Sequence, residues 1–142
     1  MKKTILFASI VLIVLFVLSI PLVNNLTAKN VEEQLLAVSL PAHTTMIESL
    51  SATGKIAGNG NGMQFFGAML IRSELTLDEL SAYYSQKLPN AVVKEQNGQV
   101  IACATNRSLS FAASVSDSEN YYIVYLFGSG IHPFSDLDLR GH

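Results

Sequence analysis

The residues best suited to holding a ligand form a loop in which glycine and asparagine alternate between two apolar runs: Gly58, Asn59, Gly60, Asn61 and Gly62. A phosphate-binding glycine loop follows a strand and opens a helix, because the free N–H groups at the helix start bind the anion. Here the next segment, Met63 to Ile71, has the composition of a strand, and the two asparagines offer calcium only neutral oxygens. We therefore predict a turn that tolerates positive φ, with a ligand loop as the alternative.

Side chains that could carry catalysis are scattered along the chain. The three histidines are His43, His132 and His142. They are too far apart in the sequence to have the short ligand spacings of a zinc site. The glutamates Glu48, Glu74 and Glu95 are isolated, and Gly128-Ser129-Gly130 lacks the framework of a serine nucleophile. We predict no catalytic residue, metal site or cofactor, and we favour a non-enzymatic protein.

The single cysteine, Cys103, excludes a disulfide within the chain. It lies in the apolar run Val100 to Ala104, which is typical of a strand. With no histidine nearby in the sequence, we interpret it as a small buried thiol rather than a nucleophile.

The N-terminal segment predicts a membrane anchor. No charged residue occurs from Thr4 to Ala28, and Ile5 to Val23 is long enough, at about 28 Å, to cross a bilayer as a helix. Lys2 and Lys3 before it keep the N-terminus in the cytoplasm, so the rest of the chain lies outside. A cleaved signal peptide with secretion is the alternative, although the nearest cleavage site, Leu26-Thr27-Ala28, has a bulky leucine where a small residue is expected.

Two other kinds of anchored protein lack their sequence marks here. A lipoprotein needs a cysteine just after the apolar core, and none is present. A type IV pilin also begins with an apolar helix, but its Gly-Phe processing site and the glutamate five residues into the mature helix are missing.

Charge limits the partners. Beyond residue 23 the chain has seven Lys and Arg against eleven Asp and Glu, a formal charge of −4, and the basic residues are scattered. Nucleic-acid binding, which needs a positive patch, is therefore not expected. The expected partners are the lipid bilayer, through the N-terminal helix, and an envelope protein or a second copy of the chain.

Two helices are predicted after the anchor. Asn30 to Val38 has a capping-box spacing between Asn30 and Glu33. The second helix begins at Thr76, with Glu79 completing a capping box and Leu75 and Leu80 placed for a hydrophobic staple. Pro89 ends it.

The strands are recognised by their apolar patterns. Thr44 to Ala57 is a strand with an irregularity at Gly54, and two strands are apolar on both faces, as central strands are: Met63 to Ile71 and Tyr121 to Phe127. Asn97-Gly98 predicts a hairpin between residues 91–96 and 99–105. Ser108 to Ser116 alternates apolar residues with serine, as a half-buried strand does.

These elements predict an α+β fold: a transmembrane helix, then an antiparallel sheet of about five or six strands with two helices on one face. The expected organisation is a cytoplasmic stub and anchor over 1–28, an extracytoplasmic domain over 29–128 and a C-terminal tail over 129–142.

The order helix, strand, strand, helix, strand, strand resembles small envelope modules such as the BON domain and the ring-building domains of sporulation channel proteins, at the level of fold. The external part also resembles uncharacterised bacterial membrane-anchored proteins through Leu40-Pro41, Gly58 to Gly62 and the Leu-x-x-Tyr-Tyr helix at Leu80 to Tyr84. We expect a membrane-anchored binding or scaffolding module of the bacterial envelope, and the alternative is an envelope enzyme whose site is assembled from distant polar residues.

Overall fold

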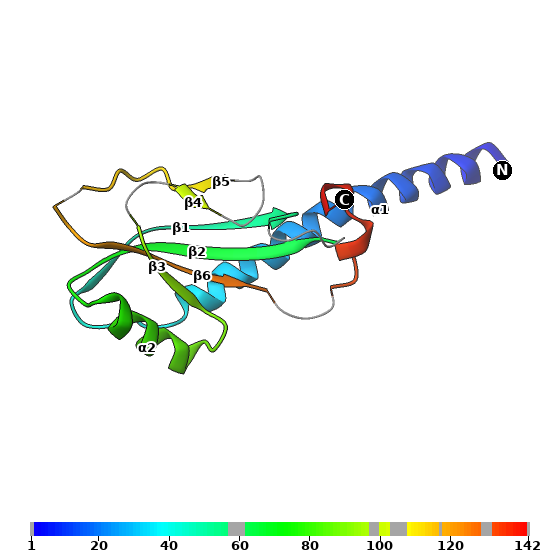
Figure 1. The fold of residues 1–142 in the computed structure, drawn as a ribbon. Coiled ribbons are helices and arrows are strands. Elements are labelled where there is room, and N and C mark those ends of the chain that lie inside the picture. Colours follow the sequence, from blue (N-terminus) through cyan, green and yellow to red (C-terminus); the bar gives the residue numbers. More distant parts are fainter. Residues whose placement is uncertain are drawn as a thin grey trace.

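A computed structural model describes residues 2–56, 62–96, 100–102, 108–116, 118–128 and 132–141. Its first element is the helix α1, Lys2–Leu36, which is 35 residues long and contains Pro21. From Lys3 to Leu18 every side chain is exposed, whereas burial begins at Ile20 and recurs along one face to Leu35. Figure 1 shows the consequence: one half of α1 protrudes and the other half lies against the sheet.

The sheet has four antiparallel strands in the order β1-β2-β6-β3. Their bounds are β1 Thr44–Gly54, β2 Gln64–Ser73, β3 Val92–Glu95 and β6 Tyr121–Phe127. Both strands predicted to be central are central and buried on both faces. A separate ladder joins β4, Val100–Ala102, to β5, Ser108–Ser110. The sequence predicted one sheet of about five or six strands. In the structure β4 and β5 pair with each other, apart from the four-stranded sheet.

Both helices cover one face of the sheet, as predicted. Leu35 of α1 packs in one cluster with Leu80 and Tyr84 of α2, Leu77–Lys87, over Met69 and Val124 of the strands. The opposite face carries Phe66, Ala68 and Ile123, which pack against Phe111 and the segment after β5. The fold therefore has three layers: helices, the four-stranded sheet, and the β4–β5 layer (Figure 1).

The predicted helix α2 is confirmed in detail. Thr76 Oγ1 accepts from the N–H of Glu79, and the Thr76 N–H donates to Glu79 Oε2 at 2.8 Å. Leu75 and Leu80 join the same apolar cluster, and Leu88 ends the helix next to Pro89. Local side-chain signals thus determine where α2 begins and ends.

The predicted helix at Asn30 is wrong in its start. Asn30 lies inside α1, which runs on without interruption from the apolar stretch, so it caps nothing. The predicted 91–96 and 99–105 hairpin is also wrong in its pairing: β3 pairs with β6, while β4 pairs with β5. The α2 connection carries the chain across to the free edge of β6, where Val93 packs under the helices. Asn97 and Gly98 lie outside the described residues.

Strand β1 is irregular at a different place than predicted. Its register against β2 shifts between Met46 and Glu48, while Gly54, at φ +148°, ends the strand. The bulge places Met46 opposite Ile71, on the face covered by the helices, whereas Glu48, opposite Leu70, stays on the face of Leu50 and Ala52. Of the predicted strand Ser108 to Ser116 only Ser108–Ser110 is extended in a ladder, although Phe111, Ala113 and Val115 do face the core.

Candidate functional site

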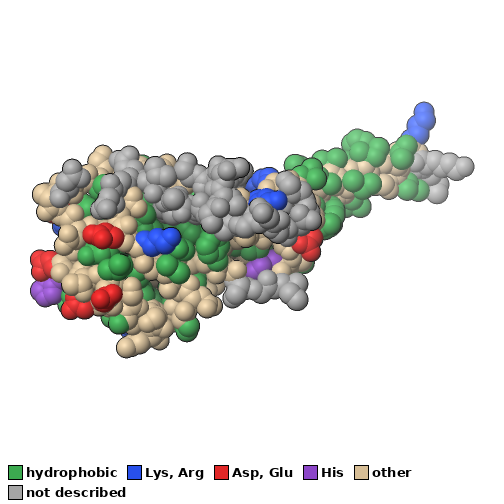
Figure 2. All heavy atoms as spheres, in the orientation of Figure 1, with side chains coloured by type: hydrophobic (Ala, Val, Ile, Leu, Met, Phe, Trp, Pro, Cys, Tyr) green, Lys and Arg blue, Asp and Glu red, His purple; other side chains and the backbone are tan. Residues whose placement is uncertain are grey.

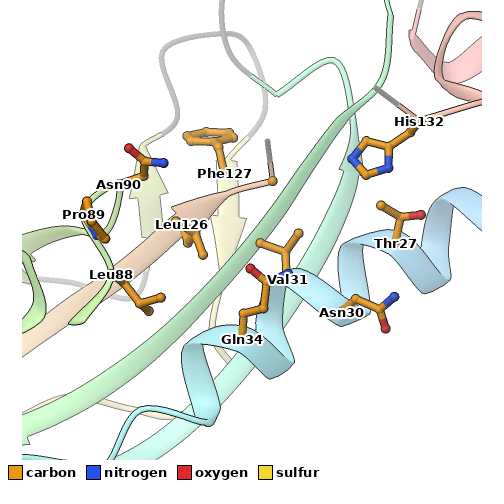
Figure 3. A pocket seen from close by; sticks show the side chains of 11 residues that line it. Thr27, Asn30, Val31, Gln34, Leu88, Pro89, Asn90, Leu126, Phe127 and His132 are labelled. Atoms are coloured by element: carbon orange, nitrogen blue, oxygen red, sulfur yellow. The ribbon is translucent and has the colours of Figure 1, made fainter. Parts of the chain in front are cut away.

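A groove runs between α1 and the connection from α2 to β3, and Figure 3 shows the side chains around it. Its volume is about 310 Å³. The residues that line it come from α1, from the connection between α2 and β3, from the end of β6 and from the C-terminal segment: Thr27, Asn30, Val31, Gln34, Leu88, Pro89, Asn90, Leu126, Phe127, Gly128 and His132.

The chemistry of this groove is polar and uncharged. Thr27, Asn30 and Gln34 project from one face of α1, at spacings of three and four residues. Val31 and Leu126, both buried, form an apolar floor. Amides both donate and accept hydrogen bonds, so the groove suits a neutral polar chain such as an extended peptide or a glycan.

His132 stands at one end of the groove. Its ring meets Phe65 edge-on, with centroids 4.5 Å apart, and its carbonyl accepts from the Ser135 hydroxyl at 2.9 Å. His132 Nε2 is buried and has no hydrogen-bond partner among the described residues. A search of the described residues finds no group of three or more His, Cys, Asp or Glu that could hold a metal ion.

Of the glycine loop, the structure describes only the last residue. Gly58, Asn59, Gly60 and Asn61 lie outside the described residues, whereas Gly62 has φ +105°, a backbone conformation that favours glycine. The next residue, Met63, donates its N–H to the Ser135 carbonyl at 3.2 Å. A second hollow of about 260 Å³, reaching from Met63 to His132, adjoins the first. A turn over Gly58 to Gly62 therefore stays a prediction.

A polar hollow of about 560 Å³ lies at the other end of the sheet, far from the protruding helix. It brings together His43, Arg72, Glu74 and Glu119, from three stretches that are far apart in the sequence. His43 Nδ1 is 3.5 Å from Glu74 Oε2, and their side chains are 68% and 82% exposed. His43 has φ +57°, in the left-handed region that few residues other than glycine adopt.

Glu119 is shared between two partners in this hollow. Arg72 Nη1 donates to Glu119 Oε1 at 2.7 Å, and the Tyr121 hydroxyl donates to Oε2 at 2.7 Å. The hydrogen bond to Glu119 raises the pKa of Tyr121 because it favours the protonated phenol. The charged side chains of this hollow pair with one another while exposed to water. Solvation of this kind weakens their interactions and gives none of them the desolvated surroundings typical of a catalytic acid or base.

The isolated glutamates have separate surroundings. Glu48 accepts from the backbone N–H groups of Ala112 and Ala113, at 3.1 and 2.8 Å, and so ties the segment after β5 to the sheet. Glu74 faces the polar hollow, and Glu95 lies on the edge strand β3. Cys103, Ser129, Gly130 and His142 lie outside the described residues.

Sequence reasoning missed a buried carboxylate on α1. Glu32 is 2% exposed, accepts from Ser49 Oγ at 2.6 Å and pairs with Lys29 Nζ at 2.8 Å. Burial by itself would raise its pKa, but the hydrogen bonds from Lys29, Ser49 and Ser51 outweigh burial and leave the pKa lowered. The sequence signal for these partners was the pair Ser49 and Ser51, which alternate along β1 and therefore lie on one face of the strand.

A second buried polar cluster joins α1 to the C-terminal segment. Asn24 Nδ2 donates to Asp138 Oδ2 at 2.9 Å, and Arg140 Nη2 donates to the same oxygen at 2.7 Å. Asn24 and Asp138 are 1% and 4% exposed. The Arg140 guanidinium, aided by Asn24, holds the pKa of Asp138 far below its usual value despite burial. The sequence signal for this cluster was Asn24 itself, a polar residue directly after the apolar stretch that ends at Val23.

No protein-family model, curated protein or solved structure matches this chain. Among the described residues one helix, within Lys3–Leu36, is long and apolar enough to cross a membrane, a property that signal sequences share. What the molecule does must therefore be argued from its own geometry.

Proposed function

We propose that this chain is a membrane-anchored extracytoplasmic module of the bacterial cell envelope that binds or scaffolds a partner. One observation carries the proposal: α1 is a single helix whose first half is apolar and exposed and whose second half is part of the domain core. An exposed apolar helix surface of this size is unfavourable in water and is stable in lipid. Figure 2 displays the apolar side chains that cover the protruding part.

The continuous helix favours an uncleaved anchor over a signal peptide. The candidate cleavage site ends at Ala28, which is 2% exposed and packs with Val31 and Phe65. Cleavage there would cut the helix inside the core and remove Asn24, the partner of Asp138. The buried aspartate would then lose a hydrogen bond that the folded domain uses.

The groove beside α1 is the binding site we favour. Its wall belongs to the same helix that crosses the membrane, so a partner held by Asn30 and Gln34 would be held at a fixed height above the bilayer. The uncharged lining favours a neutral polar segment of a peptide or glycan over an ionic ligand.

Topology is tested with protease added to intact protoplasts that express the full chain. We expect the 15.4 kDa chain to remain in the membrane fraction and its domain to be digested, because Lys3 holds the N-terminus inside. Complete protection would reverse the orientation. A shortened, soluble product present before protease is added would establish cleavage instead.

The groove is tested by placing a photo-crosslinking amino acid at Gln34, with Glu33 as the matched control. Both residues are exposed and adjacent on α1, but only Gln34 lines the groove. We expect a discrete adduct from position 34 and little from position 33. An adduct of twice the chain mass would identify a second copy as the partner. Equal labelling from both positions, or none, would contradict the groove as the binding site.

The enzyme alternative rests on the polar hollow at the other end of the sheet, which brings His43 together with Arg72 and Glu74. Such an enzyme would alter purified cell-wall material, and His43→Ala would abolish the product. Absence of any product from the unmodified protein would count against this alternative.

A further inference from the structure

The last described residues, 132–141, pack around α1 where the helix leaves the domain, and we name them the collar (Figure 1). Asn24 Nδ2 donates to the Phe134 carbonyl at 3.2 Å and to Asp138. The ring of Phe134 meets that of Phe16 edge-on, with centroids 5.8 Å apart. The collar therefore contacts the same apolar stretch that forms the proposed anchor.

Lengths place the collar at the membrane surface. At about 1.5 Å per residue, the stretch from Lys3 to Leu18, in which no residue is buried, is about 24 Å long, whereas the hydrocarbon core of a bilayer is about 30 Å thick. A spanning helix must therefore extend about one more turn into the hydrocarbon, to about Leu22. The Arg140 side chain reaches Pro21 O and Asn25 Oδ1 at this level, at 3.3 and 3.0 Å.

The collar exposes large apolar side chains at this level. Leu139 is 88% exposed and Leu137 is 54% exposed. On α1, Leu22, next to the Pro21 that Arg140 contacts, is 60% exposed. Single exposed leucines are ordinary on protein surfaces. Leucines from two segments beside a membrane-spanning helix form the apolar side of an interfacial contact.

The polar groups of the collar are compatible with the headgroup region. The carboxylate of Asp138 is buried and paired with Arg140, so it presents no unpaired negative charge to lipid. The Arg140 side chain is 37% exposed, and its guanidinium donates to Asp138, Asn25 Oδ1 and Pro21 O, so this charge is also compensated within the molecule. Asp136, the other acidic residue, lies beside Gly62, with Oδ1 3.0 Å from where a Cβ on that glycine would be.

We infer that the collar is a second membrane contact: it lies in the headgroup region of the outer leaflet, with Leu137 and Leu139 directed toward the acyl chains, and sets the depth of α1 and the tilt of the domain. The occupant of this surface is the lipid bilayer. The inference rests on the proposed membrane anchor and adds to it that the C-terminal segment belongs to the membrane-bound part.

The chain contains no tryptophan, so a single introduced tryptophan reports its own surroundings. Leu139→Trp is compared with Leu12→Trp in the anchor and Leu77→Trp on α2, all at exposed positions. The full-length proteins are reconstituted in vesicles of phosphatidylcholine and phosphatidylglycerol that carry quenching groups at shallow or deep acyl positions. For Leu139→Trp we expect a blue-shifted emission and shallow quenching about twofold or more above that of Leu77→Trp.

The three positions separate the inference from the anchor on which it depends. Quenching of Leu12→Trp by deep groups, with Leu139→Trp unquenched like Leu77→Trp, would retain the anchor and overturn the collar contact. No quenching at Leu12 would overturn both. Because Leu139 makes little packing contact, its replacement should preserve the fold, which resistance to limited proteolysis checks. Leu137→Trp supplies an independent reading, and an unquenched result there too would decide against the contact.

Discussion

The two helices that cover the same face of the sheet are held there in different ways. Helix α2 has its own start signal, the reciprocal hydrogen bonds between Thr76 and Glu79, and it buries Leu80 and Tyr84 along one face. Burial of the Tyr84 hydroxyl raises its pKa to about 12, so this phenol stays neutral at physiological pH. What defines α2 lies within the helix and the residues on either side of it.

Helix α1 is positioned by residues far away in the sequence. A Cβ on Gly67 would lie 2.6 Å from Glu32 N and Cα, so the helix rests directly on the backbone of β2. Glu32 also accepts from Ser49, and Asn24 donates to Asp138, 114 residues later. The comparison shows that a helix defined by local signals and one defined by docking can share one core, and that they should respond to different mutations.

The largest effect is expected at the contact between α1 and β2. Gly67→Val places two methyl groups where the backbone of Glu32 lies, and backbone cannot move aside as a flexible side chain can. We expect a loss of about 3 kcal/mol or more in the free energy of unfolding, measured by urea denaturation of the full chain in detergent. Thr45→Val on the exposed edge of β1 is the control and should unfold at nearly the wild-type midpoint.

The next effect is expected at the collar. Asp138→Asn removes the charge that Arg140 and Asn24 share and should cost about 2 kcal/mol. The folded pKa of Asp138 lies below its unfolded value near 3.8. Its contribution is therefore present above that unfolded value and is lost as the pH falls toward the folded pKa.

A pH series checks this assignment. The difference in unfolding free energy between the wild type and Asp138→Asn should be constant near neutral pH and should shrink below about pH 4. A difference that persists unchanged at low pH would mean that the carboxylate charge is not what binds the collar to α1.

A smaller effect is expected at the start of α2. Thr76→Ala removes the acceptor for the Glu79 N–H and should cost about 1 kcal/mol. Thr76→Ser, which retains the hydroxyl, should recover most of the loss when both variants are measured by urea denaturation of the full chain in detergent. If serine is no better than alanine, the cap does not determine the helix start.

The smallest effect is expected in the polar hollow, where the side chains of Arg72 and Glu119 are 45% and 39% exposed. Arg72→Gln should change the free energy of unfolding by less than about 1 kcal/mol, because water already solvates both charges. The change should be smaller still in 0.5 M salt, which screens exposed pairs. An effect as large as that of Asp138→Asn would show that exposure is a poor guide to the strength of these ion pairs.

The sequence alone determined the elements whose signals are local. The capping box at Thr76, the apolar strands at Met63 to Ile71 and Tyr121 to Phe127, and the apolar face from Leu109 to Val115 were predicted from neighbouring residues. The structure has the cap, places the two strands at Gln64–Ser73 and Tyr121–Phe127, and packs that apolar face on the core. Such signals suffice because a helix cap or an alternation of burial depends on residues only two to four positions apart.

Tertiary structure alone decided how these elements pair. Asn30 has the spacing of a helix cap, yet the helix already extends through it, because α1 gains more by continuing onto the sheet than by starting anew. Strand β3 pairs with β6 rather than with β4, and there Val93 packs in one cluster with Tyr84 of α2 and Val124 of β6. The partners of Glu32 and Asn24 lie on β1 and in the collar, at separations that no sequence periodicity reports. A buried polar group takes its partner from whichever segment the fold brings within about 3 Å, and only the folded chain specifies that segment.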